Sequence, residues 1–427
     1  MARIEPPRTP NIPPHIFPLR TRQFRVPKSL SALRHRNYRL FIVGQLIATA
    51  GMWMQIIAQG WLVYEISGSE LALGVVSSAS AIPVLLISPW GGVIVDRVSK
   101  RHLLMITQSS SMLLAFILSA LVFTDVVRVW HVVLLAVAMG VVSSFDGPAR
   151  QAFVVEMVGH EDLPNAIALN SMTFNSGRII GPAIGGVLLV TLGAAWCFFL
   201  NGLSIMAVLI SLLNMNLPVS KRKRESRSAR QQLTSGLAYV QHEPELRALL
   251  LMALVFSTFG TSYATILPAF VDKVLAQSAS AYGTINAITG MGAVTAAFFI
   301  AQFGERIPRG RVLAGAILIF PVILVVFAYT QPYYLSLALA YGLGITFMLV
   351  FTLLNTLLQT NLRDELRGRV LSLYTLTFFG FAPFGNLLVG SLSEAIGISP
   401  TLVLSASVSF LLAALILVTT PGVRRLI

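Results

Sequence analysis

The residue in this chain that most clearly suggests chemistry is Arg178, which stands near the middle of the apolar stretch 165–190. A charged side chain at bilayer depth is unfavourable by about 2.5–3.5 kcal/mol on insertion scales, so Arg178 must face protein or water. At 100° per residue, Ser171, Asn175, Arg178 and Pro182 fall on one line of a helix. Three interpretations are open: Arg178 binds an anion, it partners an acid that exchanges protons, or helix carbonyls satisfy it.

An acid inside an apolar run is the second candidate. Asp146 is the only acid that we place clearly inside such a run, and Arg150 follows about one turn later on the same helical face. Asp146 either carries a proton or forms a local ion pair with Arg150 at a helix end kinked by Pro148. We do not pair Asp146 with Arg178, because its expected depth is only one or two turns from the inner surface.

A third group of charges follows the second apolar run. Asp96 stands at the end of that run, where an acid suits a cationic partner and the positive N-terminus of a neighbouring helix. We expect Arg150 to be that partner. The other members of the pattern are Gly92, Arg97, Lys100 and Arg101. The competing interpretation is a basic turn with no further role.

Uncharged polar and aromatic residues recur inside the apolar runs and suit the lining of a central path. They are Gln55, Gln59, Asn175, Tyr263, Asn286, Asn355 and Gln359. Such groups suit an amphipathic organic solute, and Arg178 favours an anionic one. For each residue alone, an interhelical hydrogen bond is the competing interpretation.

Catalytic and metal chemistry are disfavoured by the residues available. Cys197 is the only cysteine, and the six histidines show no His-x-x-x-His pairing. The chain therefore offers no internal disulfide and no cysteine-based zinc cluster. It also offers no convergent nucleophile and base that we can assemble. We expect no enzyme activity, no cofactor and no metal site.

The elements that must position these residues are membrane helices. The 427 residues are 55% hydrophobic and 11% charged, whereas soluble domains carry about 25% charged residues. A helix needs about 20 mostly apolar residues to cross a bilayer, which predicts an all-α integral membrane protein. The twelve expected runs are 38–64, 71–95, 102–124, 129–150, 164–190, 194–216, 248–272, 279–303, 311–330, 332–360, 366–393 and 400–420.

The charge distribution predicts sidedness. The net charge is +14, and the basic residues gather in the tails and in alternate loops. Acids such as Glu65, Glu70, Asp125 and Glu394 stand on the other side, with only Arg128 and Lys273 as basic exceptions there. Because basic loops stay cytoplasmic, we expect both termini in the cytoplasm. The net charge is then a topology signal and not a nucleic-acid footprint.

The runs divide into two groups of six, at 38–216 and 248–420. A Pro- and Arg-rich cytoplasmic tail, 1–37, precedes them, and a short tail, 421–427, follows. The segment 217–247 combines a charge run with an amphipathic pattern. We interpret it as a linker with an amphipathic helix on the inner membrane surface, with anionic-lipid binding as the sharper alternative.

The two groups look like repeats. Gly177 in the fifth run corresponds to Gly380 in the eleventh, and Pro182 has a near-equivalent in Pro383. Repeats on this scale place a substrate site near the midplane between the halves. The symmetry fails at Arg178, where the eleventh run has Phe381 instead.

This organisation resembles the major facilitator superfamily. The superfamily's loop signature G-x-x-x-D-R-x-G-R-R/K is matched by Gly92, Asp96, Arg97, Lys100 and Arg101, with Ser99 in place of its glycine. The signature of its antiporters, G-x-x-x-G-P-x-x-G-G, is matched in full by Gly177, Gly181, Pro182, Gly185 and Gly186. The segments 146–153 and 165–171 resemble, more narrowly, the branch that includes bacterial enterobactin exporters.

The resemblance implies twelve transmembrane helices in two six-helix pseudo-repeats. It implies a secondary transporter that exports a small amphipathic organic solute by proton antiport with alternating access, the solute being like a siderophore, a drug or a metabolite. It also implies that the loop between the second and third spans stabilises the outward-facing state. Symport uptake or lysophospholipid flipping is the alternative, and a non-transporting sensor or embedded enzyme is more remote.

The same resemblance sets the expected surroundings of the protein. The expected partners are the solute, protons as the coupling ion, and membrane lipids, with no nucleic acid. We expect a monomer that crosses the inner (plasma) membrane many times.

Overall fold

The computed structural model describes residues 28–159, 161–215, 239–304, 306–360 and 364–426. Across these ranges the chain is helical and contains no strand. Eleven helical segments in the same ranges are long and apolar enough to cross a membrane. The prediction of an all-α membrane protein is therefore confirmed.

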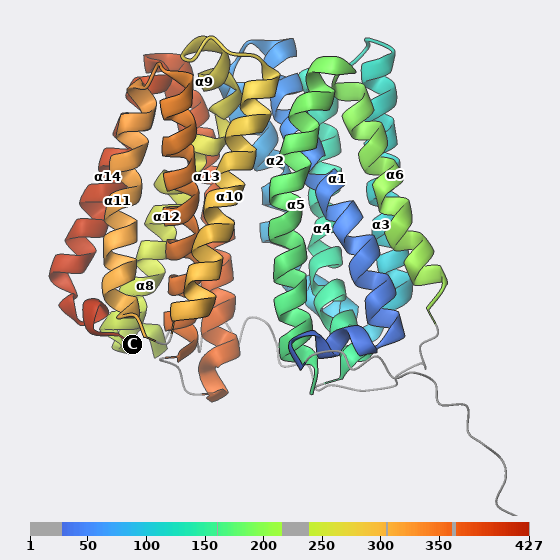
Figure 1. The fold of residues 1–427 in the computed structure, drawn as a ribbon, viewed down its shortest axis with the longest axis horizontal. Coiled ribbons are helices and arrows are strands. Elements are labelled where there is room, and N and C mark those ends of the chain that lie inside the picture. The colour runs from blue at the N-terminus through green and yellow to red at the C-terminus, as the bar shows by residue number, and fades with distance from the viewer. Residues whose placement is uncertain (1–27, 160, 216–238, 305, 361–363, 427) are drawn as a thin grey trace, which may run out of the picture.

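The first half of the chain forms one bundle, called here the N-terminal bundle (Figure 1). A short 3₁₀ turn, η1 (Lys28–Arg34), leads into it. Its helices are α1 (Arg36–Ser67), α2 (Glu70–Arg97), α3 (Lys100–Phe123), α4 (Val129–Val158), α5 (Leu163–Thr191) and α6 (Ala194–Leu213).

The second half forms the C-terminal bundle beside it (Figure 1). Its elements are α8 (Pro244–Val255), η2 (Phe256–Gly260), η3 (Thr261–Thr265), α9 (Leu267–Lys273), α10 (Ala279–Phe303), α11 (Arg309–Tyr329), α12 (Tyr333–Thr360), α13 (Asp364–Ile396), α14 (Ile398–Thr419) and η4 (Pro421–Arg425). We call the end of both bundles that carries the C-terminus the lower end, and the opposite end the upper end.

Glycines make equivalent corners in the two bundles. Gly193 joins α5 to α6 with φ +88°, and Gly397 joins α13 to α14 with φ +91°. Both ψ values are near 165–170°, a backbone conformation that is essentially restricted to glycine. The repeat predicted from sequence therefore extends to the turns between the helices.

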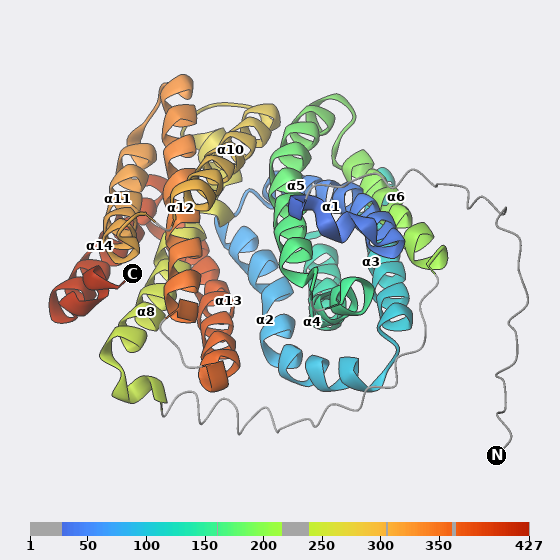
Figure 2. The same cartoon turned by 60° about the horizontal axis from the view of Figure 1, so that its bottom comes forward.

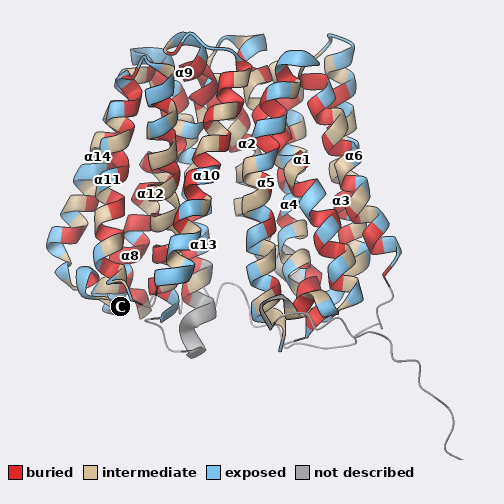
Figure 3. Ribbon diagram, viewed as in Figure 1, coloured by how far each residue is buried: buried red, intermediate tan, exposed pale blue. Residues whose placement is uncertain are grey.

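The outer faces of the two bundles are apolar, as expected for surfaces that contact lipid. Large apolar side chains are exposed on many helices, including Phe298 at 70%, Leu411 at 65% and Val418 at 71% (Figure 3). Apolar surface on this scale is unusual for a soluble monomer. It is the expected surface of helices whose neighbours are acyl chains.

The fifth span lacks a strongly apolar stretch of the kind found in the eleven segments above. α5 has 29 residues but is not among the eleven strongly apolar segments found in the described ranges. Its polar positions, among them Asn170, Asn175 and Arg178, lower its mean hydropathy. It packs between α1 and α10, at the boundary of the two bundles (Figure 2). Protein therefore replaces lipid along much of its surface.

The seventh span is present, but the predicted run over 248–272 is divided among several helical elements. α8 starts earlier, at Pro244, and gives way to the π turn η2, the 3₁₀ turn η3 and finally α9. Hydroxyl groups there bond back to the helix: Thr261 Oγ1 donates to the Ser257 carbonyl at 2.9 Å, and Ser262 Oγ to the Thr258 carbonyl at 2.7 Å. Such insertions into the helical ladder are a known cause of kinks.

The fourth span is longer than predicted. α4 continues past position 150, through Pro148, to Val158. Asp146 is therefore about three turns from the end of its helix, and not one or two. Predictions for the tail up to residue 27 and for the linker over 216–238 fall outside the described residues.

The bundles contact each other in their upper half, where small residues bring helix backbones together. A Cβ on Gly186 of α5 would lie 2.8 Å from the Cα of Gly283 on α10. A Cβ on Gly390 of α13 would lie 3.2 Å from the Cα of Gly74 on α2. The helices diverge toward the lower end in Figure 1. The two glycine crossings thus close the upper end around a pseudo-symmetric pair of contacts.

Candidate functional site

Arg178 lies where the bundles meet, and aromatic rings from both of them contact it. Its guanidinium carbon is 4.8 Å from the ring centroid of Phe347 on α12 and 5.8 Å from that of Trp53 on α1. Tyr263, from the 3₁₀ turn η3, lies in the neighbourhood of Arg178. The break in the seventh span is what supplies Tyr263. We call Trp53, Tyr263 and Phe347 the arginine cage.

The arginine cage leaves the charge only partly compensated. No hydrogen bond or ion pair joins Arg178 to another residue of the described chain, and its side chain keeps a partial exposure. Cation–π contacts contribute about 0.5–2 kcal/mol each. Placing the charge at this depth costs about 2.5–3.5 kcal/mol on insertion scales and more by other estimates. The interpretation in which helix carbonyls satisfy Arg178 has no support in this geometry.

Trp53 adds an unfilled polar position to the arginine cage. Its ring packs edge-on against Phe174, with 5.5 Å between centroids. Its indole nitrogen is buried and has no acceptor among the described residues. A buried donor without an acceptor is unfavourable by about 1–3 kcal/mol. The cage thus combines an uncompensated cation with an N–H group that lacks a partner.

The glycines of α5 explain how α1 comes close to Arg178. A Cβ on Gly177 would lie 2.6 Å from Thr49 Cγ2, and one on Gly181 would lie 2.6 Å from Trp53 Cβ. Gly185 continues the line against Met54, at 3.2 Å. Pro182 is buried on the same helix. Because the line carries no side chains, α1 packs directly on α5 and brings Trp53 beside Arg178.

Asp146 is enclosed in a polar cluster within the N-terminal bundle. It forms a close ion pair with Arg150 and accepts hydrogen bonds from Thr107 Oγ1 and Gln108 Nε2, both at 2.8 Å. Its side chain is 13% exposed. The local ion pair is therefore present, and Arg178 is not part of it. Asp96 was the other expected partner of Arg150. Its side chain is not among those that the structure describes, and the surroundings of Gly92 are not described either.

Replacing Asp146 with alanine is expected to destabilise the protein. The change leaves the Arg150 cation without its partner and removes the acceptor for two hydrogen bonds, at a cost of about 2–4 kcal/mol. Asp146→Asn keeps an acceptor for Thr107 and Gln108 and should lose less. Thermal unfolding of the purified protein measures both variants. Glu65→Ala, at an exposed position, is the control, and equal midpoints for Asp146→Ala and that control would contradict the prediction.

Basic residues of the second loop make contacts at the lower end. Lys100 Nζ lies 3.3 Å from Glu156 Oε1 on α4. Arg101 Nη2 donates to the Leu213 carbonyl at 3.1 Å, at the C-terminal end of α6, where a cation suits the helix dipole. Arg97 is exposed. These contacts tie α3 to α4 and α6 within one bundle.

The chain before α1 docks on the start of α5. His35 Nε2 lies 2.7 Å from Asp162 Oδ2, in the turn that precedes α5. Hydrogen bonds from Ser31 and His35 hold the pKa of the Asp162 carboxyl below its usual range. The Ala32 amide donates to Asn165 Oδ1 at 3.0 Å, and Tyr38 Oη donates to the Ala166 carbonyl at 2.8 Å. η1 therefore fixes the lower end of the helix that carries Arg178.

The other candidate lining residues are mostly satisfied within their own bundle. Gln55 accepts a hydrogen bond from Asn201 of α6. Asn175 Nδ2 and Asn286 Nδ2 each donate to a carbonyl one turn earlier on their own helix. Asn355 and Gln359 bond to each other along α12. Gln59 has intermediate exposure, and no side-chain hydrogen bond is found for it among the described residues. Of this set, Tyr263 is the residue that interacts with Arg178.

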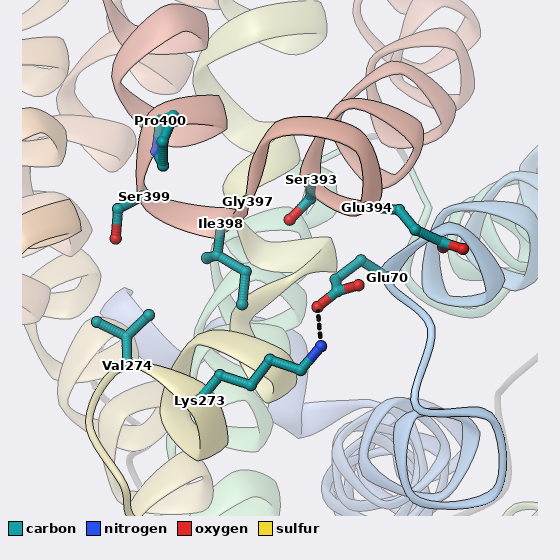
Figure 4. Close-up of a pocket in the computed structure, with 9 residues that line it drawn as sticks. All are labelled: Glu70, Lys273, Val274, Ser393, Glu394, Gly397, Ile398, Ser399 and Pro400. Atoms are coloured by element: carbon teal, nitrogen blue, oxygen red, sulfur yellow. Dashed lines mark hydrogen bonds and ion pairs between the residues drawn. The ribbon is translucent and has the colours of Figure 1, made fainter.

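Sequence reasoning missed a set of contacts between the bundles at the upper end, which we call the upper latch. Lys273 Nζ lies 2.7 Å from Glu70 Oε1, and Tyr64 Oη donates to Asp272 Oδ2 at 2.9 Å. Glu394 Oε2 accepts hydrogen bonds from Ser69 Oγ at 2.6 Å and from the Leu71 amide at 3.1 Å. Figure 4 shows Glu70, Lys273 and Glu394 together around a pocket at this end.

The signal for the upper latch was in the charge pattern. Lys273 is one of two cations on a side otherwise marked by acids, and it follows Asp272 directly. Glu394 is one of those acids, and its side chain is exposed even though it accepts hydrogen bonds from the other bundle. Pairing Lys273 with Glu70 needs the contact between the bundles, which one sequence does not reveal.

The whole chain matches known membrane transporters. The family model described as "Transmembrane secretion effector" (MFS_3) matches residues 27–424. A staphyloferrin A transporter of Staphylococcus aureus is 26% identical over 366 residues, covering 85% of this chain and 91% of that protein. The multidrug efflux pump Tap of Mycolicibacterium fortuitum is 26% identical over 397 residues, covering 91% and 96%.

Solved structures agree on the fold. A bacterial homologue of the human lysosomal transporter Spinster, in an inward-facing and occupied conformation, has a TM-score of 0.72 at 14% identity and covers 91% of this chain and 97% of its own. A D-xylose–proton symporter has a TM-score of 0.70 at 12% identity, with coverages of 90% and 97%. At these identities the likeness concerns the fold alone.

Proposed function

The chain belongs to the transmembrane secretion effector family of major facilitator transporters, and from that premise we propose that it exports a small amphipathic organic solute in exchange for protons. Its relatives include proteins named as an efflux pump and as a siderophore transporter. A drug-like, siderophore-like or metabolite-like solute fits both names. The protein acts by transport and not by catalysis.

One observation carries the direction of transport in this proposal. The complete antiporter signature lies on α5, where Gly177, Gly181 and Gly185 receive α1 and Gly186 meets Gly283 of the other bundle. Close helix packing here leaves little room for a leak path beside the solute. A tight contact of this kind is what an exchanger needs to keep solute and protons from crossing independently.

The arrangement of the two bundles supports alternating access in this proposal. The ion pair and hydrogen bonds that join the bundles in the described ranges lie in their upper half. We propose that the lower end is cytoplasmic, in line with the basic residues gathered there, and that this conformation faces inward. Outward opening then requires the upper latch and both glycine crossings to separate while the lower end closes. The protein works as a monomer in the plasma membrane, with both termini inside.

Proton coupling is tested in everted membrane vesicles loaded with a pH-sensitive dye and energised to acidify the lumen. Adding a transported solute to an antiporter releases luminal protons, so the pH gradient is expected to fall in proportion to solute uptake. A panel of siderophores and drugs serves as the solute set. Vesicles without the protein are the control.

The sign and the coupling of the signal decide between mechanisms. Solute accumulation that survives collapse of both the pH gradient and the membrane potential, by nigericin together with valinomycin in potassium medium, would rule out proton antiport. Solute movement out of the everted vesicles, in the direction that corresponds to uptake by the cell, would favour symport instead.

A further inference from the structure

The arginine cage is a recognition site for one charge type, and we propose that Arg178 binds the carboxylate of an amphipathic organic anion whose apolar body lies against Trp53 and Phe347. The inference rests on the proposed function and specifies its solute class. It starts from a cation that has aromatic neighbours and no acid among the described residues. A cation in that state at bilayer depth is stabilised by an anion that binds beside it.

The two largely buried acids of the described chain, Asp146 and Glu70, have other partners, so Arg178 is not explained as part of a proton relay. Asp146 is paired with Arg150 and bonded by Thr107 and Gln108. Glu70 is paired with Lys273 at the upper end. The missing anion is therefore supplied by the solute.

The geometry of the arginine cage selects the rest of the solute. A planar guanidinium offers a fork of donors that matches a carboxylate in bidentate fashion. Rings that already flank the guanidinium also offer apolar faces to a flat or hydrocarbon body. The unpartnered indole N–H of Trp53 is one more donor for a solute oxygen, reached when the ring turns. A neutral sugar fills none of these roles well.

The site lies between the two bundles, so binding of the solute there affects the contact between them. Arg178 belongs to the N-terminal bundle, whereas Phe347 and Tyr263 belong to the C-terminal bundle. An anion on Arg178 draws the guanidinium away from the rings of the opposite bundle. Binding thereby changes the contact between the bundles as well as the charge of the site.

The test uses the purified full-length protein in detergent and two probes that differ only in charge. 1-Naphthaleneacetate carries a carboxylate on an aromatic body, and 1-naphthaleneacetamide is its neutral counterpart. We expect the acid, at concentrations well above its dissociation constant, to raise the unfolding midpoint by about 2–4 °C, and the amide to raise it much less. Arg178→Met should weaken binding of the acid at least tenfold, while Arg128→Met, at an exposed position, should bind it like the unaltered protein.

Stability without any probe separates a binding arginine from a structural one. Arg178→Met removes an uncompensated charge, so its unfolding midpoint without probe is expected to equal or exceed that of the unaltered protein. A lower midpoint would mean that Arg178 holds the helices together, and would overturn the assignment. Arg178→Lys should keep the preference for the acid with weaker binding, because lysine lacks the planar fork. Arg178→Lys therefore provides a second measurement of the preference for the acid if Arg178→Met fails to fold.

Besides a lower midpoint of Arg178→Met, three outcomes of the probe experiment overturn the inference. They are equal shifts from the acid and the amide, no acid-specific shift in the unaltered protein, and an acid-specific shift that survives in Arg178→Met. Proton-coupled export of a neutral solute without acid-specific binding would overturn it and leave the proposed function standing. Acid-specific binding without proton-coupled export would support it and count against the proposed function.

Discussion

Replacing Gly186 with leucine is expected to reduce transport at least tenfold while leaving the protein folded. A Cβ at this position would lie 2.8 Å from the Cα of Gly283, and Gly283 has no side chain that can move aside. The two backbones would have to separate, which prevents closure of the upper end between α5 and α10. The packing inside each bundle is untouched, because α1 meets Gly185 and not Gly186. Solute flux in vesicles measures the effect.

A reporter cysteine shows where the block lies. In a Cys197→Ala background, Ser280→Cys on α10 is next to the crossing, and a membrane-impermeant maleimide added from outside should label it faster in Gly186→Leu. Gly315→Leu is the matched control, because a Cβ there meets nothing within 4 Å. Transport at the unaltered level by Gly186→Leu would show that close approach at this crossing is not needed.

Replacing Lys273 with methionine is expected to shift the protein toward opening at the upper end. Lys273 is the cation paired with Glu70, whose side chain is only 5% exposed in this conformation. Removing the cation leaves a buried carboxylate without its ion pair, which is unfavourable for the closed form. Because the lysine itself is 47% exposed, solvent screens the pair, and we expect about 1–3 kcal/mol, or roughly 5–150-fold in population. The same maleimide labelling measures it.

The double variant isolates the interaction from other effects of the change. Glu70→Gln combined with Lys273→Met removes both charges and should restore much of the closed population, so the two effects should not add. Arg128→Met, an exposed cation outside the upper latch, should label like the unaltered protein. Labelling rates in Lys273→Met equal to that control would mean that the pair does not hold the bundles together.

Much of the fold could be predicted from the sequence, because the hydrocarbon core of a bilayer limits which structures can cross it. Every span must satisfy its own backbone, so length and hydropathy located the helices and their order. α5 shows the strength and the limit of that rule. Its length marked it as a span, and the charge of Arg178 indicated that part of it must face protein or water, but its position at the boundary of the bundles came only from the structure.

The errors arose where local chemistry overrides hydropathy. The seventh span is apolar enough to be read as one helix, but Ser257, Thr261 and Ser262 are placed to interrupt it. α4 runs through Pro148 because a proline inside a membrane helix is tolerated when neighbouring groups satisfy the freed carbonyl. Both errors concern the path of one chain segment and not the number or order of spans.

The sequence identified Arg178, at the centre of the candidate site, but not all of the residues around it. Arg178 stood out because a charge in an apolar run is costly wherever the chain folds. Phe347 gave no such signal, since an aromatic residue in a membrane helix is ordinary until the opposite bundle is in place. Tyr263 was selected as a polar aromatic residue, but only the break in its span explains why it reaches Arg178.

The two glycine crossings have a further consequence for the speed of the cycle. Each time long side chains interlock at an interface, they lose rotamer freedom worth up to about 1.5–2 kcal/mol per residue. Gly74, Gly186, Gly283 and Gly390 have no rotamers to lose. In the proposed cycle the crossings would therefore form and separate with little entropic penalty in either direction, and we expect the charges of the upper latch, not the crossings, to set how long the upper end stays shut.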